Sequence, residues 1–188
     1  MKKSTFIFFI ALLIHSFAIA QSNKKAAAST SQTIDSGFPR NFIGHWKGKL
    51  NWMVAGKPAQ QFQMQLIIQP ADTAGQYTWQ IIYGTDNKDN RPYILKPADT
   101  AKGHWLVDER DGIILDSYLH GNCLQGAFTV MNNTVVDNYC IENGKMHVEF
   151  FSIKLSDKNQ TGKGTDETPF VQSYRMGSYQ KGVLTKIK

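Results

Sequence analysis

Carboxylate side chains gather in one short part of the chain, and their types and spacing suit acid–base chemistry. Asp108 and Glu109 precede a turn at Asp111-Gly112, and Asp116 and His120 follow it. Adjacent antiparallel strands joined by that turn would bring Asp108 or Glu109 close to Asp116, as a general acid and a general base require. An exposed hairpin end is the alternative interpretation, because Asp-Gly is a common turn sequence.

The histidine spacings do not indicate a metal site. His45, His104, His120 and His147 follow residue 20, and no two of them have the spacing of zinc ligands. The chain also contains no Gly-x-Ser-x-Gly nucleophile motif, phosphate-cradling loop or dinucleotide fingerprint. We therefore expect no metal and no cofactor. Haem stays open, because one axial histidine leaves no spacing pattern.

Cys123 and Cys140 are the two cysteines of the chain, and such a pair in an oxidising compartment favours a disulfide. We expect a hairpin turn at Asn132-Asn133. That turn would leave the cysteines on one face of the sheet but two positions out of register. A bulge or another register would bring them opposite each other. Two separate buried thiols are the alternative.

Hydrophobic alternation predicts the elements that must position these residues. In 42–54 the even positions are apolar or glycine and the odd positions are mostly polar, which predicts a half-buried strand with Trp46 and Trp52 on its inner face. Similar patterns predict further strands at 60–69, 77–83, 93–96, 104–110, 113–120, 124–130, 134–141 and 146–155, with one or two more in 171–176 and 179–186.

The fold class follows from the number of strands and their connections. About ten strands joined by short, hairpin-like turns favour an antiparallel meander. An open meander would leave two exposed edges, and closing it removes both. We therefore predict an all-β fold, an antiparallel up-and-down β-barrel of about 8–10 strands. A barrel of that size is wide enough to hold one small ligand.

The N-terminal residues predict export. Residues 1–20 combine a basic start, an apolar run and a small-x-small end, which is typical of a secretory signal peptide. Residues 21–38 are expected to be a flexible leader and 39–188 the barrel domain. The expected location is periplasmic or extracellular, with no membrane-spanning segment in the mature chain. The net charge is +6, but the basic residues form no cluster interleaved with aromatic residues, which argues against nucleic-acid binding.

Gly44-His45-Trp46 resembles the Gly-x-Trp motif that opens the first strand of the calycins, the superfamily of lipocalins and their relatives. The resemblance implies a lipocalin-like barrel over residues 40–187, in which Trp46 packs across the closed end and Arg175, on a late strand, covers it. Arg91-Pro92-Tyr93 is similar to a strand start in chromophore-lyase barrels of this superfamily. The Gly-x-Gly that follows the tryptophan in nitrobindin-like haem proteins is not present after Trp46.

These observations predict a secreted, lipocalin-like protein that binds a small, largely apolar ligand inside the barrel and does no chemistry. The residues expected to line the pocket are Trp52, Met64, Trp79, Tyr83 and Tyr93. One alternative is an enzyme that uses Asp108, Glu109, Asp116 or His120 in the same cavity. Another is a protein-interaction module with a solid core, whose loop 156–169 contacts a partner.

Overall fold

The structure is a computed structural model, and it describes residues 37–188. The expected signal peptide, 1–20, and the leader as far as residue 36 lie outside the described residues. Phe38 packs edge-on against Phe42 and Trp105, with ring centres 4.8 and 4.9 Å away. The last residue of the expected leader therefore belongs to the packed domain.

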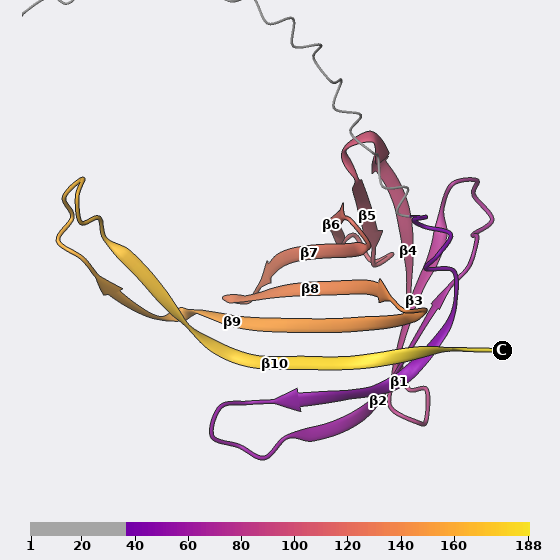
Figure 1. The fold of residues 1–188 in the computed structure, drawn as a ribbon, viewed down its shortest axis with the longest axis horizontal. Coiled ribbons are helices and arrows are strands. Elements are labelled where there is room, and N and C mark those ends of the chain that lie inside the picture. Colours follow the sequence, from indigo (N-terminus) through magenta and orange to yellow (C-terminus); the bar gives the residue numbers. More distant parts are fainter. Residues whose placement is uncertain (1–36) are drawn as a thin grey trace, which may run out of the picture. The chain divides into compact units, whose positions relative to one another are not determined.

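The described residues form ten strands and one short 3-10 turn (Figure 1). These elements are β1 (Gly44–Met53), β2 (Gln60–Ile68), β3 (Tyr77–Tyr83), β4 (Asp89–Asp99), η1 (Thr100–Lys102), β5 (His104–Asp108), β6 (Ile114–His120), β7 (Cys123–Val130), β8 (Asn133–Glu142), β9 (Lys145–Thr161) and β10 (Val171–Ile187). Each strand pairs antiparallel with the next in sequence, and β1 pairs with β10. The predicted all-β, closed, up-and-down antiparallel barrel is confirmed.

The seam between β1 and β10 depends on two glycines. A Cβ atom on Gly48 would lie 2.3 Å from the carbonyl oxygen of Val183, and one on Gly182 would lie 2.5 Å from the carbonyl oxygen of Lys49. Neither position has space for any other residue without a shift of backbone. These glycines permit the close backbone approach with which the two ends of the meander join.

One end of the barrel is filled by large side chains. Trp46 is 1% exposed, and its indole Nε1–H donates a hydrogen bond of 2.7 Å to the carbonyl oxygen of Phe42. Further fully buried side chains around it are Leu50, Met64, Leu66, Ile68, Leu95, Met146 and Leu184. Because the strands alternate in direction, this packed end contains the starts of β1, β3, β5, β7 and β9 and the ends of the even-numbered strands.

Two predicted strands are shorter than the observed ones. β4 covers 89–99 instead of 93–96 and contains both Pro92 and Pro97. The second proline adjoins a register shift in the pairing with β5, where a missing backbone donor is tolerated. The predicted loop 156–169 is also too long, because β9 continues as far as Thr161.

The chain 171–187 forms one irregular strand, β10, with register shifts after Tyr174 and after Met176. Beyond the last pairings with β8 and β1, β9 and β10 pair only with each other and form a two-stranded arm (155–178). Figure 1 shows this arm extending past the ends of the neighbouring strands.

The β7–β8 hairpin corrects one predicted turn. Val130 pairs with Asn133, so the two central turn residues are Met131 and Asn132, not Asn132-Asn133. Both have positive φ values, 47° and 60°, as a type I′ turn requires. This register brings Cys123 directly opposite Cys140, and the two form a disulfide.

We predict that the disulfide contributes substantially to stability. It joins residues 17 apart in sequence, and a loop of that size corresponds to about 3 kcal/mol of unfolding free energy in the chain-entropy account. The Cys123→Ser/Cys140→Ser double variant should lose about that amount in urea unfolding measured by tryptophan fluorescence. A thiol reagent should modify neither cysteine in unfolded protein that has not been reduced. Labelling of both would contradict the disulfide.

Candidate functional site

The open half of the barrel contains a cavity of about 530 Å³. Its walls are mostly apolar and aromatic, and they include Ile81, Val107, Leu115, Leu124, Phe128, Val135 and Phe150. The polar groups at the cavity come from Tyr83, Arg91, Tyr93, Glu109, Ser117, Thr129, Asp137, Tyr139 and Gln180. A volume of this size with apolar walls and a few polar groups is typical of small-molecule sites.

Three of the five residues expected to line a pocket do line this cavity: Trp79, Tyr83 and Tyr93. Their contact with a ligand stays a prediction. Met64 is instead fully buried in the packed half. Trp52 is half-buried near the end of β1, between Gln60 and Gln180, and is not among the residues that line the cavity. Alternation gives the face of a strand correctly, but not the depth at which the packed core ends.

The basic residue over Trp46 is Lys186, so the assignment to Arg175 is wrong. The Nζ atom of Lys186 lies 4.8 Å from the centre of the Trp46 ring, and the two residues are direct cross-strand partners. A Cβ atom on Gly44 would lie 2.5 Å from Cε of Lys186, so this glycine leaves room for the lysine stem. Arg175 lies on the arm, where it forms an exposed ion pair of 3.2 Å with Asp157.

Three of the four residues considered for acid–base chemistry have partners outside the cavity lining. Asp108 pairs with Lys96, and this hydrogen bond holds the pKa of Asp108 below its usual value. Asp116 accepts a contact of 2.6 Å from Nε2 of His104, and His120 Nδ1 lies 2.9 Å from Oε1 of Gln125. None of the three lines the cavity.

Glu109 is the exception among these acidic residues, because its side chain lines the cavity. Burial raises the pKa of Glu109, and the charge of Asp111 raises it further. The hydroxyl of Tyr93 shares a hydrogen bond with the carboxyl group of Glu109. This pair forms part of the polar edge of the cavity.

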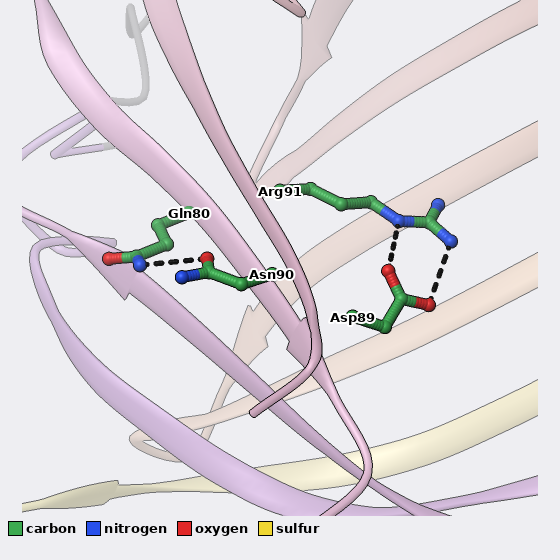
Figure 2. Close-up of polar contacts among 4 residues, drawn as sticks. All are labelled: Gln80, Asp89, Asn90 and Arg91. Carbon is green, nitrogen blue, oxygen red and sulfur yellow. Dashed lines mark hydrogen bonds and ion pairs between the residues drawn. The ribbon is translucent and has the colours of Figure 1, made fainter. Parts of the chain in front are cut away.

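Arg91 on β4 is held at the same edge by its neighbours. Its Nε and Nη2 atoms donate hydrogen bonds of 2.8 and 3.0 Å to the two carboxylate oxygens of Asp89 (Figure 2). The guanidinium carbon lies 4.9 Å from the centre of the Tyr83 ring, and burial raises the pKa of Tyr83 to about 12. Asn90 turns the other way and bonds to Gln80 on β3 (Figure 2), so β4 alternates between the two faces here.

Asp137 is the cavity residue that the sequence reasoning missed. It lies on β8 opposite Gly126, and a Cβ atom on that glycine would come within 2.9 Å of its Oδ1 atom. Burial raises the pKa of Asp137 to about 6, while a hydrogen bond from the backbone N–H of Gly126 opposes the shift. The sequence contained a signal for this residue, because Asp137 alternates with Val135 and Tyr139 and therefore occupies an inward position of the strand.

None of His45, His104, His120 and His147 lines the cavity, and residues 37–188 contain no group of three or more potential metal-ligating side chains. Within the same range, no helix is long and apolar enough to cross a bilayer. Tyr118 on β6 is 43% exposed and stacks on His104 on the outer face, because the inward positions of β6 are Leu115 and Ser117.

Comparison with known proteins supports the fold alone. No protein family and no curated protein matches the chain's sequence. A crystal structure of a protein of unknown function from the DUF3598 family of Nostoc punctiforme is similar over 79% of this chain and 48% of that one, at 10% identity and a TM-score of 0.58. The chain thus spans about half the length of that protein. Rv2717c from M. tuberculosis, at 10% identity and a TM-score of 0.34 over 79% of this chain and 94% of that one, is too distant for further argument.

We predict that the charge of Asp137 destabilises the fold above neutral pH. Its pKa is raised from an ordinary 3.8 to about 6 in the folded protein, so folding favours the protonated form. Stability is therefore greatest below pH 4 for this group, and is lost as the pH rises from about 4 to 6. Two pKa units correspond to about 3 kcal/mol, which we take as an upper limit.

The Asp137→Asn variant tests this dependence. It should raise the unfolding free energy by about 2–3 kcal/mol at pH 8 and change it little at pH 4, as measured by urea unfolding. Asp116→Asn is the matched control, because Asp116 is exposed on the outer face, and its effect should stay within about 0.5 kcal/mol at pH 8. An equal effect of Asp137→Asn at both pH values would show that the buried charge is not the cause.

Proposed function

We propose that the protein is an exported, lipocalin-like carrier that binds a small, largely apolar molecule inside its barrel and does no chemistry on it. The observation that carries this proposal is the cavity of about 530 Å³, which lies inside a closed barrel and is lined mainly by apolar and aromatic side chains. A cavity with such walls favours an apolar ligand, and its few polar groups would fix the orientation of the ligand.

The division of the barrel into two halves supports the same proposal. The packed half contains Trp46 and most of the other fully buried side chains, and their burial stabilises the fold. The open half leaves its volume unfilled, although unfilled volume next to apolar side chains destabilises a protein. A bound ligand would restore the contacts that these walls lack.

Export is part of this proposal. Residues 1–20 would act as a signal peptide, 21–36 would belong to a leader, and the mature protein would be periplasmic or extracellular. The Cys123–Cys140 disulfide supports an oxidising compartment, since disulfides persist there and are rare in the cytosol. The lipocalin-like assignment is supported by the closed antiparallel barrel and by Gly44 and Trp46 at its packed end.

The two alternatives receive less support. An acid–base enzyme would need the residues first considered for it, and of these only Glu109 reaches the cavity, joined there by Asp137. An interaction module with a solid core does not account for the cavity. The carrier accounts for the cavity and its apolar walls together.

We predict that filling the cavity weakens ligand binding. The neutral fluorophore N-phenyl-1-naphthylamine should bind the native protein saturably with one-to-one stoichiometry. Leu115→Trp places a large ring in the cavity and should weaken that binding at least about tenfold, because the displaced ligand loses about 1.4 kcal/mol or more of contact. Val135→Phe, on another wall, should weaken it in the same direction. The measurement is a fluorescence titration.

Ile114→Trp provides the matched control. Ile114 is the neighbour of Leu115 on β6 but is 54% exposed, so the new ring would lie outside the barrel. Its fluorophore affinity should equal that of the native protein. Circular dichroism checks that each variant is folded. Native protein without saturable binding would refute the carrier proposal, as would equal losses in Ile114→Trp and in both cavity variants.

A further inference from the structure

We propose that the ligand of this cavity is a small organic cation, an apolar or aromatic body with a protonated amine, and that Asp137 is its counter-ion. This inference rests on the proposed carrier function and specifies the chemical class of its ligand. It depends on the position of Asp137, the partners of the other charged groups and the aromatic rings nearby.

The cavity wall has space for the carboxylate of Asp137 beside a glycine. It lies over Gly126 on the neighbouring strand, where a methyl group would come within 2.9 Å of Oδ1 and 3.3 Å of Oδ2. Phe150 is its partner on the other side, on β9, and offers no polar group. The wall therefore leaves space for the carboxylate by omitting a side chain, and the carboxylate lines the cavity.

Asp137 has capacity for further hydrogen bonds. An ionised carboxylate accepts about four, and the backbone N–H of Gly126 is the one donor that acts on its pKa. No basic side chain of residues 37–188 influences that pKa. A partly desolvated carboxylate without a cationic partner is unfavourable, so a ligand that supplies an ammonium group would satisfy both its charge and its free lone pairs.

The other charged groups at the cavity already have partners. Arg91 is held by both oxygens of Asp89, and the carboxyl group of Glu109 is bonded to the Tyr93 hydroxyl. The cavity and its mouth thus contain three carboxyl groups and one guanidinium. An anionic ligand such as a fatty acid would meet an excess of negative charge and an arginine that is already neutralised.

Aromatic rings surround the same space. Tyr139 packs edge-on against Trp79 at 5.0 Å and against Phe150 at 5.6 Å, and all three line the cavity. The charge of Asp137 acts on both Tyr83 and Tyr139, which places these two phenols in its electrostatic neighbourhood. Rings near a carboxylate suit an amine with an apolar body, because ring faces attract cations and also bury apolar surface.

The titratable groups that face the cavity determine how binding depends on pH. Tyr83, Tyr93 and Tyr139 all have raised pKa values and stay neutral between pH 5 and 8, and Arg91 stays charged there. Asp137, with a pKa of about 6, changes charge within this range. Glu109, whose pKa burial also raises, is the other carboxyl group to be tested. Amine binding should therefore weaken from pH 8 to pH 5.

The test compares three ligands of nearly equal shape, 1-naphthylmethylamine, 1-naphthalenemethanol and 1-naphthoate, by displacement of N-phenyl-1-naphthylamine. At pH 8 the amine should bind at least about tenfold more tightly than the alcohol, as a charge-assisted hydrogen bond implies, and the carboxylate most weakly. Asp137→Asn should remove the preference for the amine, because it should weaken the binding of the amine far more than the binding of the alcohol. Gly126→Ala, which crowds the carboxylate, should reduce the preference. Asp116→Asn on the outer face should not alter it.

The outcomes separate this inference from the carrier proposal. If the alcohol binds as well as the amine and Asp137→Asn changes neither, the cationic ligand is refuted and the carrier function stands. If Glu109→Gln removes the amine preference and Asp137→Asn does not, the assignment to Asp137 is overturned. If neither the fluorophore nor any of the three ligands binds, the carrier function fails and the inference fails with it.

Discussion

The close contact between β1 and β10 is the constraint on which the rest of the structure depends. It closes the barrel, and closure gives every strand two hydrogen-bonded neighbours within the barrel. Gly48 and Gly182 make the contact possible, because a side chain at either position would collide with the backbone of the partner strand. Once the barrel is closed, the interior is fixed by ten strands, and their inward side chains determine how much of it is filled.

These side chains fill the interior unequally along the barrel axis. Near the start of β1, Trp46 and its neighbours are fully buried, and the Nζ atom of Lys186 lies over the indole ring. Toward the other end the inward residues include Ser117, Gly126 and Asp137, which are too small to meet across a barrel of this size. The cavity therefore results from residue size at inward positions. Under the proposed carrier function, the polar residues at this end would determine which ligands the cavity suits.

The sequence predicted the fold well because strand alternation and turn residues are local signals. It predicted the face of most residues for the same reason. It did not predict depth, so Met64 was expected in the cavity and lies in the core. It did not show which basic residue of the last strand lies over Trp46: the family resemblance implied Arg175, but Lys186 occupies that position and Arg175 lies on the arm. Asp137 was missed because a single polar residue within an apolar face was not weighed as a signal.

The disulfide and the cavity are linked through the register of β7 and β8. Cys123 opposite Cys140 fixes the same pairing that places Asp137 over Gly126, three residues away on each strand. A slip of one residue would turn Asp137 outward and bring Asn138 into the cavity, since side chains alternate with period two. The partly buried charge of Asp137 opposes folding above neutral pH, and so favours rearrangements that expose it. The covalent link between Cys123 and Cys140 joins these two strands in the register that places Asp137 in the cavity wall, and so opposes a slip that would remove it.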